Sequence, residues 1–206
     1  MPDISSKNVV SAYRFYAPLY DLLFGAVLGP GRKRMARTVH ELEPTRILEI
    51  GIGTGLTLNQ YPHDASLTGI DLSPEMLGRA RKRASEMQGR EIDLHLMDAE
   101  ALDFEDASFD CITVPYVLSV TPNPDQLVSE LRRVCRPGGY IVIVNHFSGS
   151  RFWWLLERIV RSVADRIGFR SDFDYGRHIL SHAWQVQSCT PVNLFGLSRL
   201  VVIRNA

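Results

Sequence analysis

The stretch Arg46-Ile-Leu-Glu-Ile-Gly-Ile-Gly-Thr-Gly55 decides the fold of this chain. Its first half is apolar and β-favouring, as in a central strand that is covered on both faces. Gly51, Gly53 and Gly55 then allow a tight turn and a close approach to a ligand, because a Cβ at these positions would clash. The stretch therefore predicts a ligand-binding turn at the end of a buried strand.

The acid before this turn indicates the kind of ligand. The dinucleotide pattern G-x-G-x-x-G directs a helix N-terminus at a pyrophosphate. Here the pattern is Glu-x-Gly-x-Gly-x-Gly, and the carboxylate of Glu49 suits a cation. S-adenosylmethionine, with its ammonium and sulfonium, fits better than NAD.

Further strands are predicted after the turn, and acids follow two of them. Asp71 ends one strand, where a carboxylate can bind ribose hydroxyls, and Asp98 follows the next, where a carboxylate can accept from an adenine amino group. Ser73 is a predicted N-cap, with Pro74 at the first position of a helix. The predicted strands after the turn cover residues 67–71, 92–97, 109–114 and 140–145, the last of them following a turn over 136–139.

This pattern resembles the class I S-adenosylmethionine-dependent methyltransferases over roughly residues 40–146. The resemblance implies an α/β, Rossmann-like fold: a seven-stranded, mostly parallel sheet with helices on both faces and a late antiparallel strand over 197–203. It places Glu49 and Gly51 by the methionine moiety of S-adenosylmethionine, Asp71 by the ribose and Met76 over the adenine. The implied cofactor-binding residues are Glu49, Gly51, Gly53, Thr54, Gly55, Asp71, Leu72, Met76, Asp98, Ala99 and Pro115. The product would be S-adenosylhomocysteine.

Length and composition fit a single domain over residues 1–206. The chain has 206 residues, of which 45% are hydrophobic, enough for a core without disulfides. Within it we expect N-terminal lid and membrane-contacting helices (1–40), a cofactor-binding core (41–146) and a substrate-side segment (147–206). The three cysteines are expected to be reduced, and neither a secretory signal nor a spanning segment is predicted. A cytoplasmic location follows.

Charge is unevenly distributed, and the flanks are basic. Residues 41–150 hold nine basic and seventeen acidic residues, whereas 151–206 hold eight basic and four acidic. The segment 151–167 combines an apolar helical stripe, arginines off that stripe and two tryptophans, which is typical of a helix on an anionic membrane. We therefore expect peripheral association with the cytoplasmic membrane, although a core-packing helix with a solvated outer face has the same pattern.

Candidate acceptor-binding residues lie near the N-terminus and at later strand ends. Tyr16 and Tyr20 can bind a cation through their rings, and Tyr116, Asn145 and His146 follow the fourth and fifth strands. Residues 113–116 read Thr-Val-Pro-Tyr, unlike the Asp/Asn-Pro-Pro-Tyr/Phe motif that holds planar amines in many DNA and protein methyltransferases. Nucleic-acid bases are therefore disfavoured as substrates.

Four short stretches of sequence outside the glycine turn resemble one group within this family. In these stretches the chain is similar to the small soluble bacterial phosphatidylethanolamine N-methyltransferases. This implies successive methylation of the lipid amine towards phosphatidylcholine. We predict His146 as the proton acceptor, Tyr16 and Tyr20 as residues that align the nitrogen, and Tyr175 and Arg177 as contacts of the lipid, with Arg177 at its phosphate. The four stretches are residues 16–21, 116–124, 144–147 and 167–173.

Two other functions remain open at this point. A quinone precursor or another small hydrophobic acceptor would need a base but no cation-binding aromatic residues. A non-catalytic, membrane-attached S-adenosylmethionine-binding protein would need a crevice without working polar groups. The expected partners are an anionic membrane and its phospholipid, without nucleic acid or metal, and a monomer is compatible with them.

Overall fold

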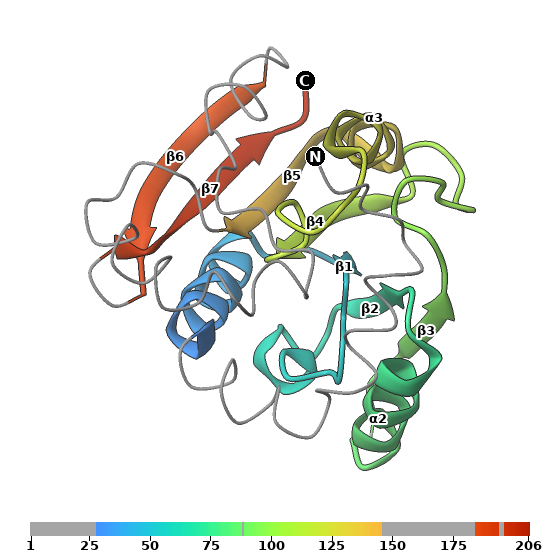
Figure 1. The fold of residues 1–206 in the computed structure, drawn as a ribbon. Coiled ribbons are helices and arrows are strands. Elements are labelled where there is room, and N and C mark those ends of the chain that lie inside the picture. Colours follow the sequence, from blue (N-terminus) through green and yellow to red (C-terminus); the bar gives the residue numbers. More distant parts are fainter. Residues whose placement is uncertain (1–27, 88, 146–183, 194–195) are drawn as a thin grey trace, which may run out of the picture.

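The structure is a computed structural model that describes residues 28–87, 89–145, 184–193 and 196–206. Its centre is a seven-stranded sheet with the strand order β3-β2-β1-β4-β5-β7-β6 (Figure 1). The strands are β1 (Arg46–Ile50), β2 (Ser66–Asp71), β3 (Ile92–Leu96), β4 (Phe109–Pro115), β5 (Cys135–Asn145), β6 (Gln185–Val192) and β7 (Ser198–Arg204).

The neighbouring strands from β3 to β5 in this order are all paired in parallel, whereas β7 is antiparallel to both of its neighbours, β5 and β6. The predicted seven-stranded, mostly parallel sheet is thereby confirmed, together with its late antiparallel strand. A helix over residues 28–42 precedes β1, and the chain between the strands forms a 3-10 turn η1 (Leu58–Gln60), α2 (Pro74–Ser85) and α3 (Pro124–Val134).

Two parts of the sheet differ from the sequence prediction. β5 begins at Cys135 and includes residues 136–139, which were predicted as a turn. Gly138 N donates to Asn205 O, and Asn205 N donates to Gly139 O, so the end of the chain extends the pairing. The edge strand β6 was not predicted, because its largely exposed, polar sequence shows no apolar alternation.

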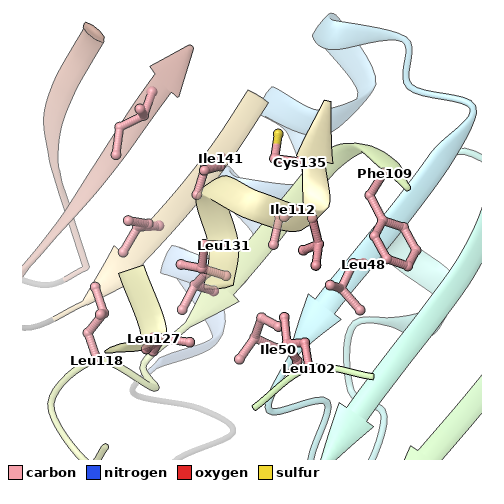
Figure 2. Close-up of a cluster of buried hydrophobic side chains, with 14 of the residues drawn as sticks. Leu48, Ile50, Leu102, Phe109, Ile112, Leu118, Leu127, Leu131, Cys135 and Ile141 are labelled. Carbon is pink, nitrogen blue, oxygen red and sulfur yellow. The ribbon is translucent and has the colours of Figure 1, made fainter. Parts of the chain in front are cut away.

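The core forms two layers, one on each face of the sheet. Alternate residues of each strand point to opposite faces, so Ile47 and Leu48 belong to different clusters. One cluster joins the sheet to α3 through Leu127, Leu131 and Val134 (Figure 2). The other joins it to helix 28–42 and to α2. Both faces of the central strands are covered, as their continuous apolar runs predict.

Side-chain caps fix where the two later helices begin. The predicted N-cap of α2 is confirmed, since Ser73 Oγ accepts a hydrogen bond from Met76 N at 3.3 Å. Asn123 caps α3 in the same way, accepting from Gln126 N at 3.2 Å. Both caps stand at the carboxyl-end edge of the sheet, so they also fix the loops there. Among the helices of the described residues, none has the length and apolar character needed to cross a membrane.

Candidate functional site

A cavity of about 330 Å³ opens at the carboxyl ends of β1, β2 and β4. The strand order reverses between β1 and β4, and such a switch point leaves a crevice between loops that leave in opposite directions. Most described residues that the sequence predicted for cofactor or substrate binding line this cavity: Glu49, Gly51, Gly53, Thr54, Asp71, Leu72, Met76, Asp98, Ala99, Pro115 and Tyr116. Residues far apart in sequence are thus brought to one wall.

Gly55 and Asn145 lie behind this wall. At Gly55, which has a φ of +79°, a Cβ would lie 2.6 Å from Leu58 Cδ1 and 3.2 Å from Ala80 Cα, so this glycine lets the loop pack on α2. Asn145 is fully buried, and its Oδ1 accepts a hydrogen bond from Ser119 Oγ at 3.3 Å. The structure gives both residues a role in packing behind the cavity, while their predicted ligand contacts stay predictions.

Glu49 is the buried acid of the site. It is only 1% exposed, and its carboxylate oxygens lie 2.8 and 2.7 Å from the hydroxyl of Thr57. Burial raises the pKa of Glu49 to about 7, against the opposing effect of hydrogen bonds from Thr57 and Tyr61 and of the positive charge of Arg32. A cation beside this carboxylate would favour its ionised form, which fits the predicted contact with an ammonium.

Asp71 supports the glycine turn from the neighbouring strand. Its Oδ2 accepts from Gly53 N at 2.8 Å, and its Oδ1 accepts from Ser73 N at 2.9 Å. Burial raises the pKa of Asp71, while these backbone hydrogen bonds oppose the increase. The carboxylate is therefore held in place at the end of β2, where the sequence predicts a ribose contact.

The far end of the cavity carries the residues predicted to meet an adenine. Met76 is buried at 4% exposure on the first turn of α2, and Leu72 is 37% exposed. Asp98 Oδ1 accepts from Glu100 N at 2.9 Å, which fixes the loop after β3. An apolar slot with a carboxylate at its rim suits a flat base that carries an amino group.

Tyr116 occupies an unusual backbone position at the end of β4. Its φ of +62° is left-handed, a conformation that non-glycine residues adopt at a cost. Its hydroxyl donates to Leu28 O at 3.1 Å and accepts from Asn193 Nδ2 at 3.0 Å. The hydroxyl thus holds helix 28–42 and the turn after β6, so the cavity wall formed by Tyr116 depends on both.

Sequence reasoning did not assign several polar residues of the cavity wall to the site, among them Arg32, Thr57, Glu100 and Thr121. Arg32 comes from helix 28–42, and Thr57 bonds Glu49. Glu100 Oε1 accepts from Thr121 Oγ1 at 2.6 Å and from Asn123 N at 2.7 Å. Glu100 could have been found from its place beside Asp98, whereas nothing local distinguishes Arg32 from its basic neighbours at 33, 34 and 37.

Several predicted residues lie outside the described part of the chain. These are the residues predicted to act on the acceptor and the basic helix predicted to bind a membrane: Tyr16, Tyr20, His146, Tyr175, Arg177 and the segment 151–167. The described site is therefore the cofactor half of the predicted crevice. Its acid, glycine turn and apolar slot fit S-adenosylmethionine.

Comparisons with known proteins agree with this geometry. Residues 48–143 match the family model described as a methyltransferase domain. The chain is 40% identical over 191 residues to phosphatidylethanolamine N-methyltransferase from Cereibacter sphaeroides, covering 92% of this chain and 93% of that protein. It is 38% identical over 136 residues to demethylmenaquinone methyltransferase from Thermus thermophilus, covering 62% of this chain and 61% of that protein.

A solved structure of a SAM-dependent methyltransferase from Thermotoga maritima has the same fold. Its TM-score is 0.69 at 19% identity, with 96% of this chain and all of that chain covered. At this identity the likeness concerns the fold alone. The fold, the family match and the residues of the cavity all indicate S-adenosylmethionine as the cofactor.

Proposed function

Because this chain belongs to the S-adenosylmethionine-dependent methyltransferases, we propose that it methylates the head-group amine of phosphatidylethanolamine at a membrane surface. Successive rounds would lead towards phosphatidylcholine. One observation carries the choice of acceptor: the 40% identity to a phosphatidylethanolamine N-methyltransferase extends over 92% of the chain, and so includes parts of both flanks of the cofactor core.

The flanks matter because they supply the acceptor side in this proposal. The cofactor core is common to methyltransferases with many acceptors, so similarity confined to it says little about the substrate. The match to the demethylmenaquinone methyltransferase from Thermus thermophilus covers 62% of the chain, and a match to demethylmenaquinone methyltransferase from Thermotoga maritima covers 96% of the chain but at only 28% identity. A quinone precursor therefore remains the second candidate, and it is supported by the 38% identity of the Thermus thermophilus match.

The chemistry asks little of the protein beyond positioning and proton removal. S-adenosylmethionine supplies a methyl group on a sulfonium, and the acceptor nitrogen must arrive in line with it. An ethanolamine head group has a lysine-like pKa and is protonated at neutral pH, so it must first lose a proton. We propose that His146 accepts this proton while Tyr16 and Tyr20 align the nitrogen.

A pH profile tests the role of His146. In a His146→Ala variant, activity should fall at neutral pH and recover in part at higher pH, where more of the amine is already free. A profile with the native shape would remove His146 from the mechanism. Tyr116 is proposed to contact the acceptor through its ring, since its hydroxyl bonds Leu28 and Asn193.

The acceptor itself is tested with labelled cofactor. The protein is incubated with methyl-labelled S-adenosylmethionine and, in separate tubes, with vesicles containing phosphatidylethanolamine, with phosphatidylcholine vesicles and with a demethylated quinone. Label is expected in mono- and dimethylated lipid in the first tube alone. Label in the quinone would overturn the proposal, and label in no acceptor would favour the non-catalytic binding protein.

A further inference from the structure

Two buried side chains of opposite charge line the cofactor cavity. Glu49 is the residue before the last of β1 and is 1% exposed, and Arg32 lies in helix 28–42 and is 9% exposed. Both are on the cavity wall. The charge of Arg32 lowers the pKa of Glu49, so the two groups are within electrostatic range. Such a wall is complementary to a part of a ligand that carries both charges.

We propose that Arg32 binds the carboxylate of the amino-acid end of S-adenosylmethionine, beside the ammonium at Glu49. That end of the cofactor is a zwitterion, and its carboxylate needs a cationic partner when it leaves water. Arg32 is the one basic side chain among the described residues of the cavity wall. A guanidinium stays charged when buried and presents paired donors to a carboxylate.

The fold fixes Arg32 at this wall through the residue before it. Gly31 packs against the hydroxyl of Tyr116, and a Cβ there would collide with that hydroxyl and lie 2.9 Å from Asn193 Oδ1. The same hydroxyl bonds Leu28 O. Helix 28–42 therefore lies tightly on the end of β4, and the next residue along the helix faces the cavity.

A second oxyanion could in principle occupy this position, namely the phosphate of a lipid head group. The carboxylate is favoured because Arg32 shares the wall with Glu49 and the glycine turn, which belong to the cofactor half of the crevice. The inference rests on the cofactor and not on phosphatidylethanolamine as the acceptor. Its binding measurements can therefore be made without lipid, which is needed only to test the phosphate alternative.

Calorimetry on an Arg32→Gln variant provides this test. The ligands are S-adenosylhomocysteine, which has the amino-acid end, and 5′-methylthioadenosine, which lacks it. We expect affinity for the first to fall by about 10- to 100-fold, as for the loss of a charged hydrogen bond, and affinity for the second to stay unchanged. Arg34→Gln is the matched control, because Arg34 is exposed on the same helix and should affect neither ligand.

Three outcomes would overturn the inference. Equal losses for both ligands would mean that Arg32 supports the structure rather than the carboxylate. Unchanged cofactor binding with a raised KM for lipid would assign Arg32 to the phosphate. If Arg32→Gln does not fold, the native protein is compared with Arg32→Lys: the native preference for S-adenosylhomocysteine over its decarboxylated analogue must shrink in the variant, and an undiminished preference contradicts the carboxylate contact.

Discussion

We expect Glu49 to make cofactor binding depend on pH near neutrality. Burial raises the pKa of this carboxyl from an ordinary 4.5 to about 7, so in the ligand-free protein it is largely protonated below pH 7. An ammonium ligand favours the ionised form, and binding below pH 7 must release a proton. Affinity for S-adenosylhomocysteine should therefore rise by roughly 25-fold between pH 5.5 and 7.5, because each unit of pH below the pKa costs about 1.4 kcal/mol.

Calorimetry over this pH range checks the prediction, and Glu49→Gln is the control. The variant cannot ionise, so its weaker binding should stay flat with pH. The raised pKa also affects the stability of the folded protein. The stability that protonated Glu49 contributes is present below about pH 4.5 and is lost as the pH rises to about 7. A native affinity that does not change with pH would contradict an ammonium contact at Glu49.

The glycine turn offers a second prediction at the level of single residues. Gly51 and Gly53 have φ values of +68° and +57°, so an alanine at either position adopts a left-handed backbone at a cost of about 1–2 kcal/mol. A Cβ on Gly51 would also collide with Val117 Cγ2, whereas on Gly53 the nearest atom is Gly51 O at 4.0 Å. Gly51→Ala should therefore destabilise the protein more than Gly53→Ala.

Urea unfolding measures both variants, and a double variant isolates the cause. In Val117→Ala the colliding methyl is absent, so adding this change to Gly51→Ala should recover the difference between the two glycine variants. If Gly51→Ala and Gly53→Ala lower the free energy of unfolding equally, backbone strain alone accounts for the destabilisation. If the double variant loses as much unfolding free energy as the sum of the two single variants, a collision with Val117 does not contribute to the destabilisation.

Among the elements, helix 28–42 depends on contacts with distant strands. Tyr116 at the end of β4 bonds Leu28 O in the helix and Asn193 Nδ2 in the turn after β6. Tyr116→Phe keeps the ring and removes both hydrogen bonds. We expect a loss of about 1–3 kcal/mol in the free energy of unfolding, with faster hydrogen exchange in helix 28–42 than in α3.

The matched control for this change is Tyr140→Phe on β5. Tyr140 is half-buried, and among the described residues no hydrogen bond of its hydroxyl is found. This control should leave both unfolding and exchange close to native. Exchange that speeds up equally in helix 28–42 and α3 would indicate a global loss of stability rather than release of one helix.

At the scale of the whole molecule, the uneven charge leads to a prediction about membranes. The basic segment 151–167 lies outside the described residues, and the membrane-binding role of its arginines is a proposal from the sequence. Replacing Arg158 and Arg161 by Glu should sharply weaken sedimentation with anionic vesicles, since each basic residue near such a surface contributes about 1 kcal/mol. Added salt should weaken the native protein in the same way.

A matched charge change in the acidic core separates local from overall charge. Arg79 and Lys82 are exposed on α2, and their replacement by Glu alters the net charge by the same amount. This control should bind vesicles almost as the native protein does. If both double variants lose vesicle binding equally, the net charge of the protein determines that binding. If neither variant loses vesicle binding, segment 151–167 is a core-packing helix.

The sequence by itself determined the cofactor half of this protein. The strand over 46–50, the glycine turn and the capped start of α2 each involve residues within a few positions of one another, so local preferences specify them without the rest of the chain. Alternation of strands and helices then restricts the sheet to a few topologies. The acids at the ends of β1 and β2 could be assigned to the cavity for this reason.

Only the tertiary structure decided which distant residues complete the wall. Arg32 lines the same cavity as Glu49 because Gly31 packs on Tyr116, a contact across 85 positions that no local pattern encodes. The edge strand β6 forms because β7 offers a partner, although its own sequence is polar. The packing of Gly55 against Leu58 and α2 and the burial of Asn145 are likewise set by the tertiary structure, and neither could be read from the residue types alone. Local propensity fixes elements, whereas contacts between residues far apart in sequence fix which side chains face the ligand.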